Sequence, residues 1–405
     1  MMFDVGNMGF MLLASSLVML MTPGLAFFYG GLVSRKNVLT IMMQSFVSMC
    51  IVTLLWVIVG FSMCFSPNDL FGLGIIGDFK YAFLLNISLD TAAPSGTIPL
   101  YLLFVYQMMF AIITPALITG AFADRVDFKA YLIFLIAWLL FVYFPFVHMV
   151  WGGGLLAQHG VLDFAGGIVV HAIAGMAALA AVFYIGRRKT HGSGPHSIPL
   201  VALGTGLLWF GWYGFNAGSE LAVNSITIIA FINTDLAASA AGFIWLLIDW
   251  LKVGKPRFTG LLTGMVAGLA TVTPAAGYVS PQSALVIGIL SGILCYIAIE
   301  FKNSREWDDA LDVWGVHGVG GVLGTISLGV FATTAINDHG ANGLLYGGTG
   351  FFVGQVIAVV IAAVWAFVFT YAMLYLIDLV TTVRVSELIE EEGLDEGITG
   401  EVAYL

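Results

Sequence analysis

The sequence predicts an all-α polytopic membrane protein with eleven transmembrane helices, built as an inverted five-helix repeat followed by a long eleventh helix. Of the 405 residues, 60% are hydrophobic and 9% are charged, whereas soluble domains are about half apolar and about a quarter charged. The mean hydropathy is +0.99. Two further observations support this class: the placement of the basic residues and a matched pair of histidines in apolar segments.

Apolar runs bounded by polar residues or by Gly and Pro define the predicted helices. A helix that crosses a bilayer needs about 20 apolar residues, so a chain of this length has room for roughly ten to twelve. The runs are 7–31, 37–62, 97–122, 128–149, 165–186, 199–218, 225–250, 259–276, 282–300, 313–332 and 348–379.

The basic residues predict the orientation. Of the 14 Lys and Arg residues, all except Lys80 fall in the connections after the odd-numbered helices. Connections rich in Lys and Arg stay on the cytoplasmic side of a membrane. We therefore expect a multi-pass protein of the cell membrane with its N-terminus outside and its C-terminus inside. An odd number of spans is required, and eleven satisfies it. The first residues carry no positive charge before the first apolar run, so no cleavable signal peptide is expected.

The predicted organisation is a transmembrane domain, residues 1–380, followed by an acidic cytoplasmic tail, residues 381–405. Helices 1–5 and 6–10 start on opposite sides of the membrane, so segments 7–190 and 199–333 predict inverted repeats. Substrate sites in such proteins lie near the midplane between the repeats. The long helix 348–379 stands outside the repeat.

Two histidines lie alone in apolar, glycine-rich segments: His171 in GGIVVHAIAG and His317 in WGVHGVGG. An ionisable side chain at bilayer depth is costly and by default indicates a substrate or proton route. A structural hydrogen bond to a backbone carbonyl and metal binding are the alternatives. Neither helix offers a third metal ligand nearby, because Asp163 and Asp312 are expected toward opposite faces of the membrane. We therefore expect the histidines to line one pore without a metal.

Other chemistry is not indicated. The three cysteines form no CxxC pair, so neither a disulfide nor a metal site is expected. The glycine runs lack the lysine and hydroxyl residue of a phosphate-binding loop and instead suggest close helix packing. Without a nucleophile–base pair or a cofactor motif, we expect no enzyme and no cofactor.

Aromatic residues and one hydroxyl gather at the predicted outer ends of several helices: Phe110, Trp151, Phe215 and Ser219. Such aromatic residues often form a belt that faces lipid. Ring faces beside a hydroxyl can instead hold a small cation, at about 0.5–2 kcal/mol per ring. Asp163, just before the fifth helix, would cap that helix or add electrostatic bias.

Two charged features remain. Residues 386–405 hold seven acids and no base, which is typical of a tail that binds a soluble partner or stays solvated. Asp235 lies inside the seventh predicted helix, where it could face a subunit interface, a neighbouring helix or water.

Five strings together resemble the ammonium transporter family, and the similarity extends from the first predicted helix to the tail. They are residues 149–157, 163–171, 209–219, 272–279 and 312–318. The resemblance implies a homotrimer of eleven-helix subunits, each with its own pore for ammonium and methylammonium.

The resemblance also implies roles for the aromatic residues. Phe110, Trp151 and Ser219 match the outer site that recruits ammonium. Phe110 and Phe215 match the stacked phenyl gate beneath that site. The presence of Trp151 favours the ammonium branch over the Rhesus-type relatives, which usually lack this tryptophan.

Further matches concern the pore. His171 and His317 correspond to the family's twin histidines, and Asp163 corresponds to the acid that supports the outer site. Gln107 and Thr273 match positions near the vestibule.

The tail resembles the family segment that docks PII-type (GlnK-like) signalling proteins. The matching positions are Arg384, Gly393, Leu394, Asp395, Gly400, Glu401 and Tyr404. The sequence departs from the pattern at Thr399, where the family often has a histidine.

A comparison of free-energy costs favours passage of the substrate through the pore as ammonia rather than as ammonium. Moving an unpaired small ion into a medium of low dielectric costs tens of kcal/mol, whereas deprotonating ammonium near neutral pH costs ~3 kcal/mol. Deprotonation also separates ammonium from potassium, which has no proton to lose. Proton co-translocation, a neutral gas channel and a sensor that signals through the tail remain open.

Overall fold

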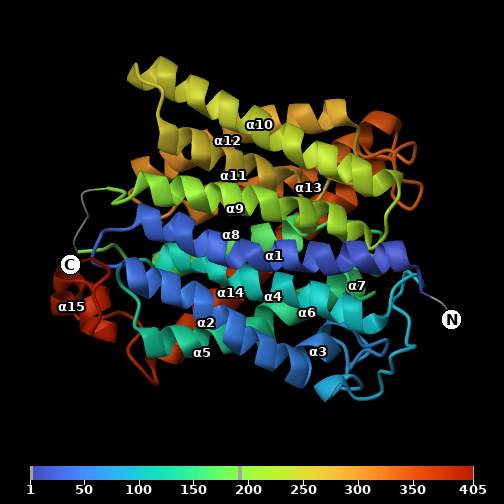
Figure 1. The fold of residues 1–405 in the computed structure, drawn as a ribbon, viewed down its shortest axis with the longest axis horizontal. Helices are drawn as coiled ribbons and strands as arrows, with labels where there is room; N and C mark the ends of the chain where they lie inside the picture. The colour runs from blue at the N-terminus through green and yellow to red at the C-terminus, as the bar shows by residue number, and fades with distance from the viewer. Residues whose placement is uncertain (1–2, 190–193, 405) are drawn as a thin grey trace.

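The computed structural model describes residues 3–189 and 194–404. Long helices in these residues run side by side along one axis, with the N-terminus at one end of the bundle and the C-terminal tail at the other (Figure 1). We call the end that carries residues 381–404 the tail end and the opposite end the N-terminal end. The described residues contain isolated bridges but no strand.

The helices along the bundle follow the predicted runs closely. They are α1 (Val5–Leu32); α2 (Val38–Leu55), continued by η1 (Trp56–Gly60) and α3 (Phe61–Phe65); α4 (Leu100–Phe122); α5 (Phe128–Trp138), continued by η3 (Leu139–Tyr143) and α6 (Phe144–Val150); η4 (Gly167–Ala172) with α8 (Ile173–Ile185); α9 (Ile198–Ala217); α10 (Ser225–Val253); α11 (Phe258–Val272); α12 (Pro281–Ser304); η6 (Trp314–Gly318) with α13 (Val319–Phe331); and α14 (Thr349–Asp378). Short elements join them: α7 (Leu155–Gln158) and the 3-10 turns η2 (Ala82–Leu84), η5 (Gly218–Glu220) and η7 (Leu344–Tyr346).

The helices have the length that a bilayer requires. Ten helices in the described residues are long and apolar enough to cross a membrane, and α11, with 15 residues, is a shorter apolar helix. Counting α11, the described chain passes eleven times between the two ends, as predicted. The predicted helix 259–276 is too long, because α11 ends at Val272. Thr273 still has helical backbone angles, but Pro274 has no N–H to donate to the carbonyl four residues earlier, so the helical hydrogen bonds stop there.

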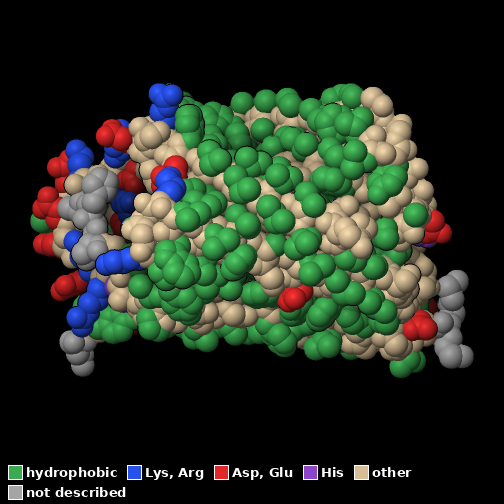
Figure 2. Space-filling model, turned by 90° about the horizontal axis from the view of Figure 1, so that it is seen from above, with side chains coloured by type: hydrophobic (Ala, Val, Ile, Leu, Met, Phe, Trp, Pro, Cys, Tyr) green, Lys and Arg blue, Asp and Glu red, His purple; other side chains and the backbone are tan. Residues whose placement is uncertain are grey.

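The surface matches a lipid environment. Hydrophobic side chains cover the sides of the molecule, and charged side chains gather mainly at the tail end (Figure 2). Along α14, a stripe of β-branched residues at helical spacing is 49–56% exposed. Its members are Val353, Ile357, Val360, Val364 and Val368. Exposed apolar stripes of this length are expected where a helix faces lipid.

Glycines bring the two halves together. A Cβ atom at Gly204 of α9 would lie 2.3 Å from the backbone nitrogen of Phe28 in α1. A Cβ atom at Gly175 of α8 would lie 2.1 Å from the Cα atom of Gly318 in η6. Each pair joins the equivalent helix of one predicted repeat to that of the other, so only residues without a side chain permit these crossings.

The acidic tail is packed against its own chain. It forms α15 (Glu387–Glu392) and the π-helical turn η8 (Asp395–Thr399). The Asp395 carboxylate accepts hydrogen bonds from the backbone N–H groups of Leu39 and Thr40, at 2.9 and 2.8 Å. The N–H of Leu394 donates to Asn37 Oδ1 at 2.8 Å. The tail therefore caps the start of α2, rather than extending into solvent as its charge suggested.

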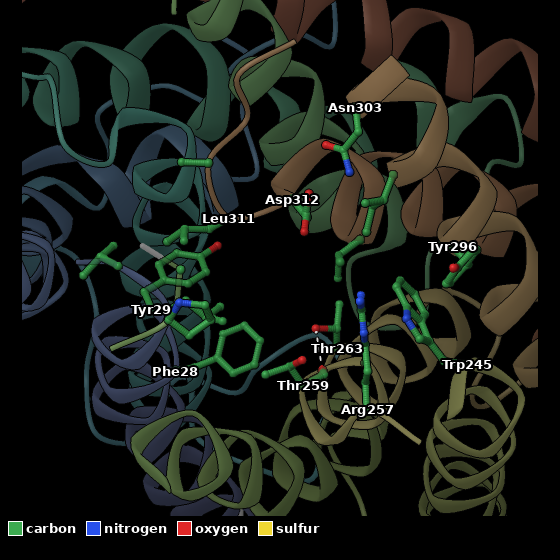
Figure 3. Close-up of a pocket in the computed structure, with 18 of the residues that line it drawn as sticks. Phe28, Tyr29, Trp245, Arg257, Thr259, Thr263, Tyr296, Asn303, Leu311 and Asp312 are labelled. Atoms are coloured by element: carbon green, nitrogen blue, oxygen red, sulfur yellow. Dashed lines mark hydrogen bonds between the residues drawn. The ribbon is translucent and has the colours of Figure 1, made fainter. Parts of the chain in front are cut away.

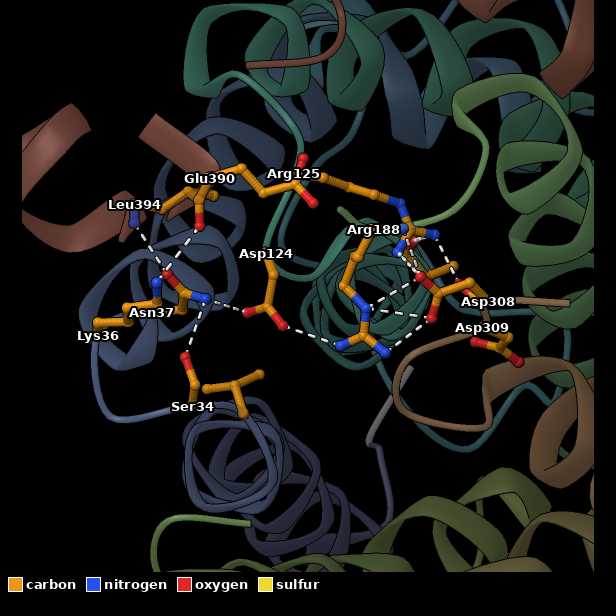
Figure 4. A network of polar contacts seen from close by, with 12 residues as sticks. Ser34, Lys36, Asn37, Asp124, Arg125, Arg188, Asp308, Asp309, Glu390 and Leu394 are labelled. Carbon is orange, nitrogen blue, oxygen red and sulfur yellow. Dashed lines mark hydrogen bonds and ion pairs between the residues drawn. The ribbon is translucent and has the colours of Figure 1, made fainter. Parts of the chain in front are cut away.

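A buried charge network lies beside this contact (Figure 4). Arg188 pairs with Asp124 at 2.9 Å and with Asp308 at 2.7 Å, and Arg125 pairs with Asp308 at 3.3 Å. Burial opposes ionisation of Asp308, but the hydrogen bonds from Arg188 and the charge of Arg125 outweigh it and hold the pKa of Asp308 at about 2. Burial lowers the pKa of Arg125 to about 10. Both groups are therefore charged near neutral pH, and Asn37 connects the network to the tail through Asp124.

Candidate substrate site and pore

The two histidines meet inside the bundle. The Nδ1 atoms of His171 and His317 are 3.2 Å apart, and their ring centroids are 5.2 Å apart with an interplanar angle of 22°. Both residues are buried, with exposures of 1% and 4%. His171 Nε2 is buried and has no hydrogen-bond partner among the described residues. The pair thus leaves ring nitrogen available to a small molecule in the lumen.

Each histidine lies in a π-helical segment at the start of its membrane helix, His171 in η4 and His317 in η6. A π-helical turn inserts one extra residue and often marks a functional position. The periodicity of the sequence did not predict these turns. They begin at opposite ends of the bundle, as an inverted repeat requires.

Asp163 caps η4. Its two carboxylate oxygens accept hydrogen bonds at 2.6–3.0 Å from the backbone N–H groups of Gly166, Gly167, Ile168 and Val169. Burial raises the pKa of Asp163 above its ordinary value, and the four backbone donors oppose that rise. The carboxylate therefore fixes the helix start that carries His171.

Asp309 is the equivalent of Asp163 in the second half. It stands eight residues before His317, as Asp163 stands eight before His171. Asp309 Oδ2 accepts a hydrogen bond from Trp314 N at 2.7 Å, at the start of η6. Burial raises the pKa of Asp309 to about 6. Sequence reasoning missed this residue, although the equal spacing was available to find it.

Asp312, which the sequence analysis considered as a third metal ligand, forms an ion pair instead of capping a helix. It lies at the tail end and pairs with Lys302 at 2.8 Å. The expectation that Asp163 and Asp312 lie toward opposite ends agrees with the structure. Across the described residues there is no group of three or more His, Cys, Asp or Glu side chains that could hold a metal.

Three aromatic rings form a cluster at the N-terminal end of the pore. The rings of Phe110 and Phe215 are 4.3 Å apart at 34°, and those of Phe110 and Trp151 are 5.8 Å apart at 90°. Phe110 and Phe215 are 0% exposed, so a lipid-facing belt is the wrong interpretation for these two residues. The ring of Phe215 also stacks on His171, with centroids 5.9 Å apart. The rings therefore connect the surface at Trp151 to the histidines.

Polar contacts hold this cluster in place. The indole N–H of Trp151 donates to the backbone oxygen of Asp163 at 2.8 Å, and the Ser219 hydroxyl donates to the backbone oxygen of Phe215 at 2.8 Å. The buried hydroxyl of Tyr106 lies 3.1 Å from Ser219 Oγ. Tyr106 was not predicted as a site residue, since a lone tyrosine in an apolar helix gives no distinguishing pattern.

Gln107 and Thr273 differ in their hydrogen bonding. Gln107 Oε1 is buried and has no hydrogen-bond partner within the described parts of the chain. The Thr273 hydroxyl accepts a hydrogen bond from the indole N–H of Trp212 at 2.9 Å. Trp212 in turn stacks on His171, with ring centroids 5.4 Å apart. Thr273 thus orients the tryptophan that packs against the histidine.

The space beside the two histidines and Phe215 is narrow. A cavity of about 10 Å³ lies there, roughly the minimum that holds one water-sized molecule. It is lined by Met21, Leu25, Phe28, Ile113, Leu117, Val170, His171, Leu208, Trp212, Phe215, Val266 and His317. A hydrated cation does not fit this space, whereas a single molecule the size of water does.

A wider vestibule follows toward the tail end, with a volume of about 390 Å³. Its wall includes Asp312, Arg257 and Phe28, which are seen around the opening in Figure 3. Phe28 and His317 line both the vestibule and the lumen. Phe28 therefore lies where the two cavities meet. The sequence analysis did not select it, although its aromatic–glycine run in α1 resembles that of Phe215 in α9.

Asp235 has a partner on the neighbouring helix. The hydroxyl of Tyr213 in α9 donates to Asp235 Oδ1 at 2.6 Å. The ring of Tyr213 stacks on Phe231, with centroids 4.0 Å apart at 6°. Of the three surroundings considered for Asp235, a neighbouring helix is the one observed.

The remaining tail residues selected from the sequence also contact the tail end. Arg384 donates to the backbone oxygen of Ile185 at 3.1 Å and to Glu390 at 2.7 Å. Gly393 has a φ of 121°, and a Cβ atom there would lie 2.6 Å from Lys36 Cβ. Glycine is needed at this position for both reasons.

The last turn of the tail is stabilised by hydrogen bonds within the tail and by one contact with His196. The Thr399 hydroxyl donates to the backbone oxygen of Asp395 at 2.6 Å and accepts from Glu401 N at 3.2 Å, before Gly400 reverses the chain with a φ of 70°. The hydroxyl of Tyr404 lies 2.9 Å from His196 Nε2. Thr399 therefore supplies a local turn contact at the position where the sequence departs from the family pattern.

The chain is similar to known proteins over nearly its whole length. The family model described as Ammonium Transporter Family matches residues 9–404. The chain is 43% identical to the ammonium transporter of Bacillus subtilis over 403 residues, covering 99% of each chain. It is 44% identical to ammonium transporter Amt1 of Archaeoglobus fulgidus over 402 residues, covering 98% of this chain and 99% of the relative.

Solved structures are similar throughout. The crystal structure of Saccharomyces cerevisiae Mep2 gives a TM-score of 0.89 at 33% identity and covers 95% of this chain and 88% of that one. A structure described as a sensor Amt protein gives a TM-score of 0.88 at 30% identity and covers 97% and 98%. The match over nearly the whole length, in sequence and in structure, shows that this chain belongs to the ammonium transporter family.

Proposed function

We propose that the protein takes up ammonium selectively across the cell membrane, recruiting NH4+ at Trp151, Phe110 and Ser219 and passing NH3 through the twin-histidine pore. Membership of the ammonium transporter family supports ammonium transport as the activity of this protein. The observation that carries the finer mechanism is the size of the cavity beside the two histidines and Phe215, about 10 Å³.

Capture requires a cation site that is open to one side. Trp151 is half-buried and stands edge-on to Phe110, so ring faces are available to a small cation at about 0.5–2 kcal/mol each. The Ser219 oxygen adds one acceptor for an ammonium N–H. Asp163 supports the site indirectly, because its backbone oxygen fixes Trp151 and its carboxylate fixes η4.

The proton leaves before the lumen. Among the described residues, no carboxylate lines the cavity beneath the stacked phenyl gate, Phe110 and Phe215. An ion entering this cavity would therefore lose its hydration without gaining a counter-charge. That cost is tens of kcal/mol, against ~3 kcal/mol for deprotonation near neutral pH. His171 and His317 then supply the hydrogen bonds that ammonia needs.

The distribution of charge on the surface supports one orientation in the membrane. The N-terminal end faces outside and the tail end faces the cytoplasm, because basic residues gather at the tail end. The protein forms a homotrimer in which each subunit has its own pore. A PII-type signalling protein binds at the tail end, where residues 381–404 lie over the cytoplasmic connections.

Uptake of labelled methylammonium into proteoliposomes tests the function. A transporter fills the vesicles, and unlabelled ammonium competes with the labelled substrate whereas potassium does not. Binding of ammonium without uptake would contradict the proposal and favour a sensor that signals through the tail, the alternative that the similarity to a sensor Amt protein supports. Uptake with a matching internal pH rise but no charge movement would instead identify a neutral NH3 channel.

A further inference from the structure

His148 joins the turn that carries Trp151 to the rest of the N-terminal end. It lies in the last turn of α6 and is 3% exposed. Its ring Nδ1 is 2.9 Å from the backbone oxygen of Cys64 in α3. Its own backbone oxygen accepts hydrogen bonds from the N–H groups of Gly152 and Gly154, at 3.1 and 2.9 Å. The ring of His148 therefore contacts α3, and its backbone holds the residues that follow Trp151.

The contact with Cys64 determines where the first ring proton lies. A carbonyl oxygen can only accept a hydrogen bond, so Nδ1 of His148 must carry a hydrogen. In the neutral ring, Nε2 then has a lone pair and no hydrogen. Nε2 can donate only when the ring carries a second proton and is a cation.

Nε2 of His148 faces a carboxylate. Asp69 Oδ2 lies 3.8 Å away, is buried and has no hydrogen bond among the described residues. The other oxygen, Oδ1, accepts hydrogen bonds from Phe71 N and Leu73 N at 2.8 and 3.0 Å. Burial raises the pKa of Asp69, but backbone hydrogen bonds such as these outweigh it and hold the pKa below the ordinary value, so the group is ionised.

We propose that His148 is a positioning residue for the ammonium site: as an imidazolium it binds Asp69 and clamps the loop of residues 66–80 onto the turn that carries Trp151. In the neutral ring the lone pair of Nε2 would face a carboxylate oxygen, and the two acceptors repel each other. Protonation of His148 closes the clamp, and its loss opens it. This inference rests on the proposed role of Trp151 in ammonium capture.

The loop and the turn are in direct contact, so movement of one reaches the other. The N–H of Leu155 donates to the backbone oxygen of Gly74 at 2.7 Å. A Cβ atom at Gly74 would lie 2.6 Å from Leu155 N, and a Cβ atom at Gly152 would lie 2.1 Å from the backbone oxygen of Cys64. Because the packing is so close, the turn that carries Trp151 cannot shift without a shift of the loop.

The surroundings of His148 contain few other ionisable groups. From α3, Cys64 directs its thiol to the backbone oxygen of Phe144 at 3.7 Å. From the loop, the second acid is Asp78, whose Oδ2 accepts from Asn68 Nδ2 at 2.9 Å and whose Oδ1 accepts from the Ser66 hydroxyl. Among the described residues, Asp69 is the charged group within ion-pair distance of His148.

The test measures the half-saturation concentration for methylammonium uptake into proteoliposomes between about pH 5.5 and pH 8, where histidines titrate. In the unaltered protein the half-saturation concentration is expected to rise about threefold or more with increasing pH. In D69N the dependence disappears, because the asparagine amide donates to the neutral ring while its oxygen keeps the bonds to Phe71 and Leu73. D78N, the matched control on the same loop, keeps the dependence of the unaltered protein.

H148N supplies a second variant, since its amide still donates to the Cys64 oxygen but carries no charge. Its half-saturation concentration is expected to be high and independent of pH. A dependence in D69N or H148N equal to that of the unaltered protein overturns the inference, as does a flat profile in the unaltered protein.

Hydrogen exchange of residues 150–156 gives a readout that does not require transport. Exchange, corrected for its intrinsic pH dependence, accelerates with increasing pH in the unaltered protein and stays constant in D69N. This pattern without uptake would uphold the clamp and refute the proposed function. Uptake without the pattern would refute the clamp and leave the function standing.

Discussion

Nδ1 of His171 and Nδ1 of His317 are 3.2 Å apart, within hydrogen-bond distance. One ring must donate and the other accept, so the pair shares one hydrogen between these atoms. Two imidazolium rings in this geometry would place two donors, and two positive charges, against each other. The pair therefore offers the lumen both a donor and an acceptor, which suits a neutral molecule such as ammonia better than a cation.

Replacing Trp151 tests the capture site. The variant W151L is expected to raise the half-saturation concentration for methylammonium by about 2- to 30-fold, which corresponds to the loss of about 0.5–2 kcal/mol of cation–π attraction. The maximal rate changes less, because the lumen is intact. W250L is the control, since Trp250 is 53% exposed on α10. An unchanged half-saturation concentration in W151L would refute capture at this ring.

Asp163 is expected to contribute more to stability than an ordinary helix cap. D163A leaves four backbone N–H groups without their acceptor, at about 1–3 kcal/mol for each one that stays buried and unpaired. D127A removes the cap of α5, a more exposed site, and costs about 0.5–2 kcal/mol. Thermal unfolding in detergent should show a larger loss for D163A, and equal losses would contradict this account.

Removing the Asp395 carboxylate should release the tail. D395A loses the hydrogen bonds to Leu39 and Thr40, each worth about 1 kcal/mol. A glutamate-specific protease is then expected to cleave at the glutamates of α15, residues 387–392, about tenfold faster. E396A, a change at the exposed neighbour, should be cleaved at the rate of the unaltered protein. Equal cleavage of D395A and E396A would show that the cap does not hold the tail.

The network at the tail end predicts a dependence of stability on pH. The pKa of Asp308 lies at about 2 in the folded protein, below its ordinary value of 3.8. Its contribution is therefore complete above pH 3.8 and is lost as the pH falls toward 2. After screening by solvent, we expect D308N to cost about 1–2 kcal/mol near neutral pH.

Thermal unfolding of D308N and of the unaltered protein at about pH 7 and about pH 3 checks this expectation. The difference between the two proteins should shrink at the lower pH. D338N serves as the control, because Asp338 is 86% exposed. A difference for D308N that is the same at both pH values would contradict the role assigned to Asp308.

The sequence predicted the membrane helices well because lipid imposes a simple rule. Every helix must be long and apolar enough to cross, and basic residues mark alternate connections. The predicted run 97–122, for example, became α4, Leu100–Phe122. Prediction was weaker where lipid does not constrain the chain. The end of α11 depends on Pro274 and not on hydrophobicity. The tail packs onto Asn37 through hydrogen bonds that composition does not reveal.

The site was predictable in its residues and less so in its geometry. His171 and His317 were selected because charge is rare in apolar helices, and the structure brings them together. Their π-helical turns were not predicted, since apolar periodicity does not distinguish such turns from an α-helix. Asp309 and Phe28 were missed although the sequence carried a signal for each. Asp309 has the same eight-residue spacing to its histidine as Asp163, and the aromatic–glycine run of Phe28 resembles that of Phe215.

The most direct measurement is the current produced by an ammonium jump on a solid-supported membrane with purified proteoliposomes, in the unaltered protein and in the double variant H171L/H317L. The account predicts a transient that grows with ammonium concentration, is absent with potassium, and disappears in the double variant when the proton accompanies ammonia. An intravesicular pH rise without current, again lost in the double variant, would mean that ammonia crosses alone. Ammonium-specific transport of unchanged size in the double variant would contradict the central claim that the two histidines form the path.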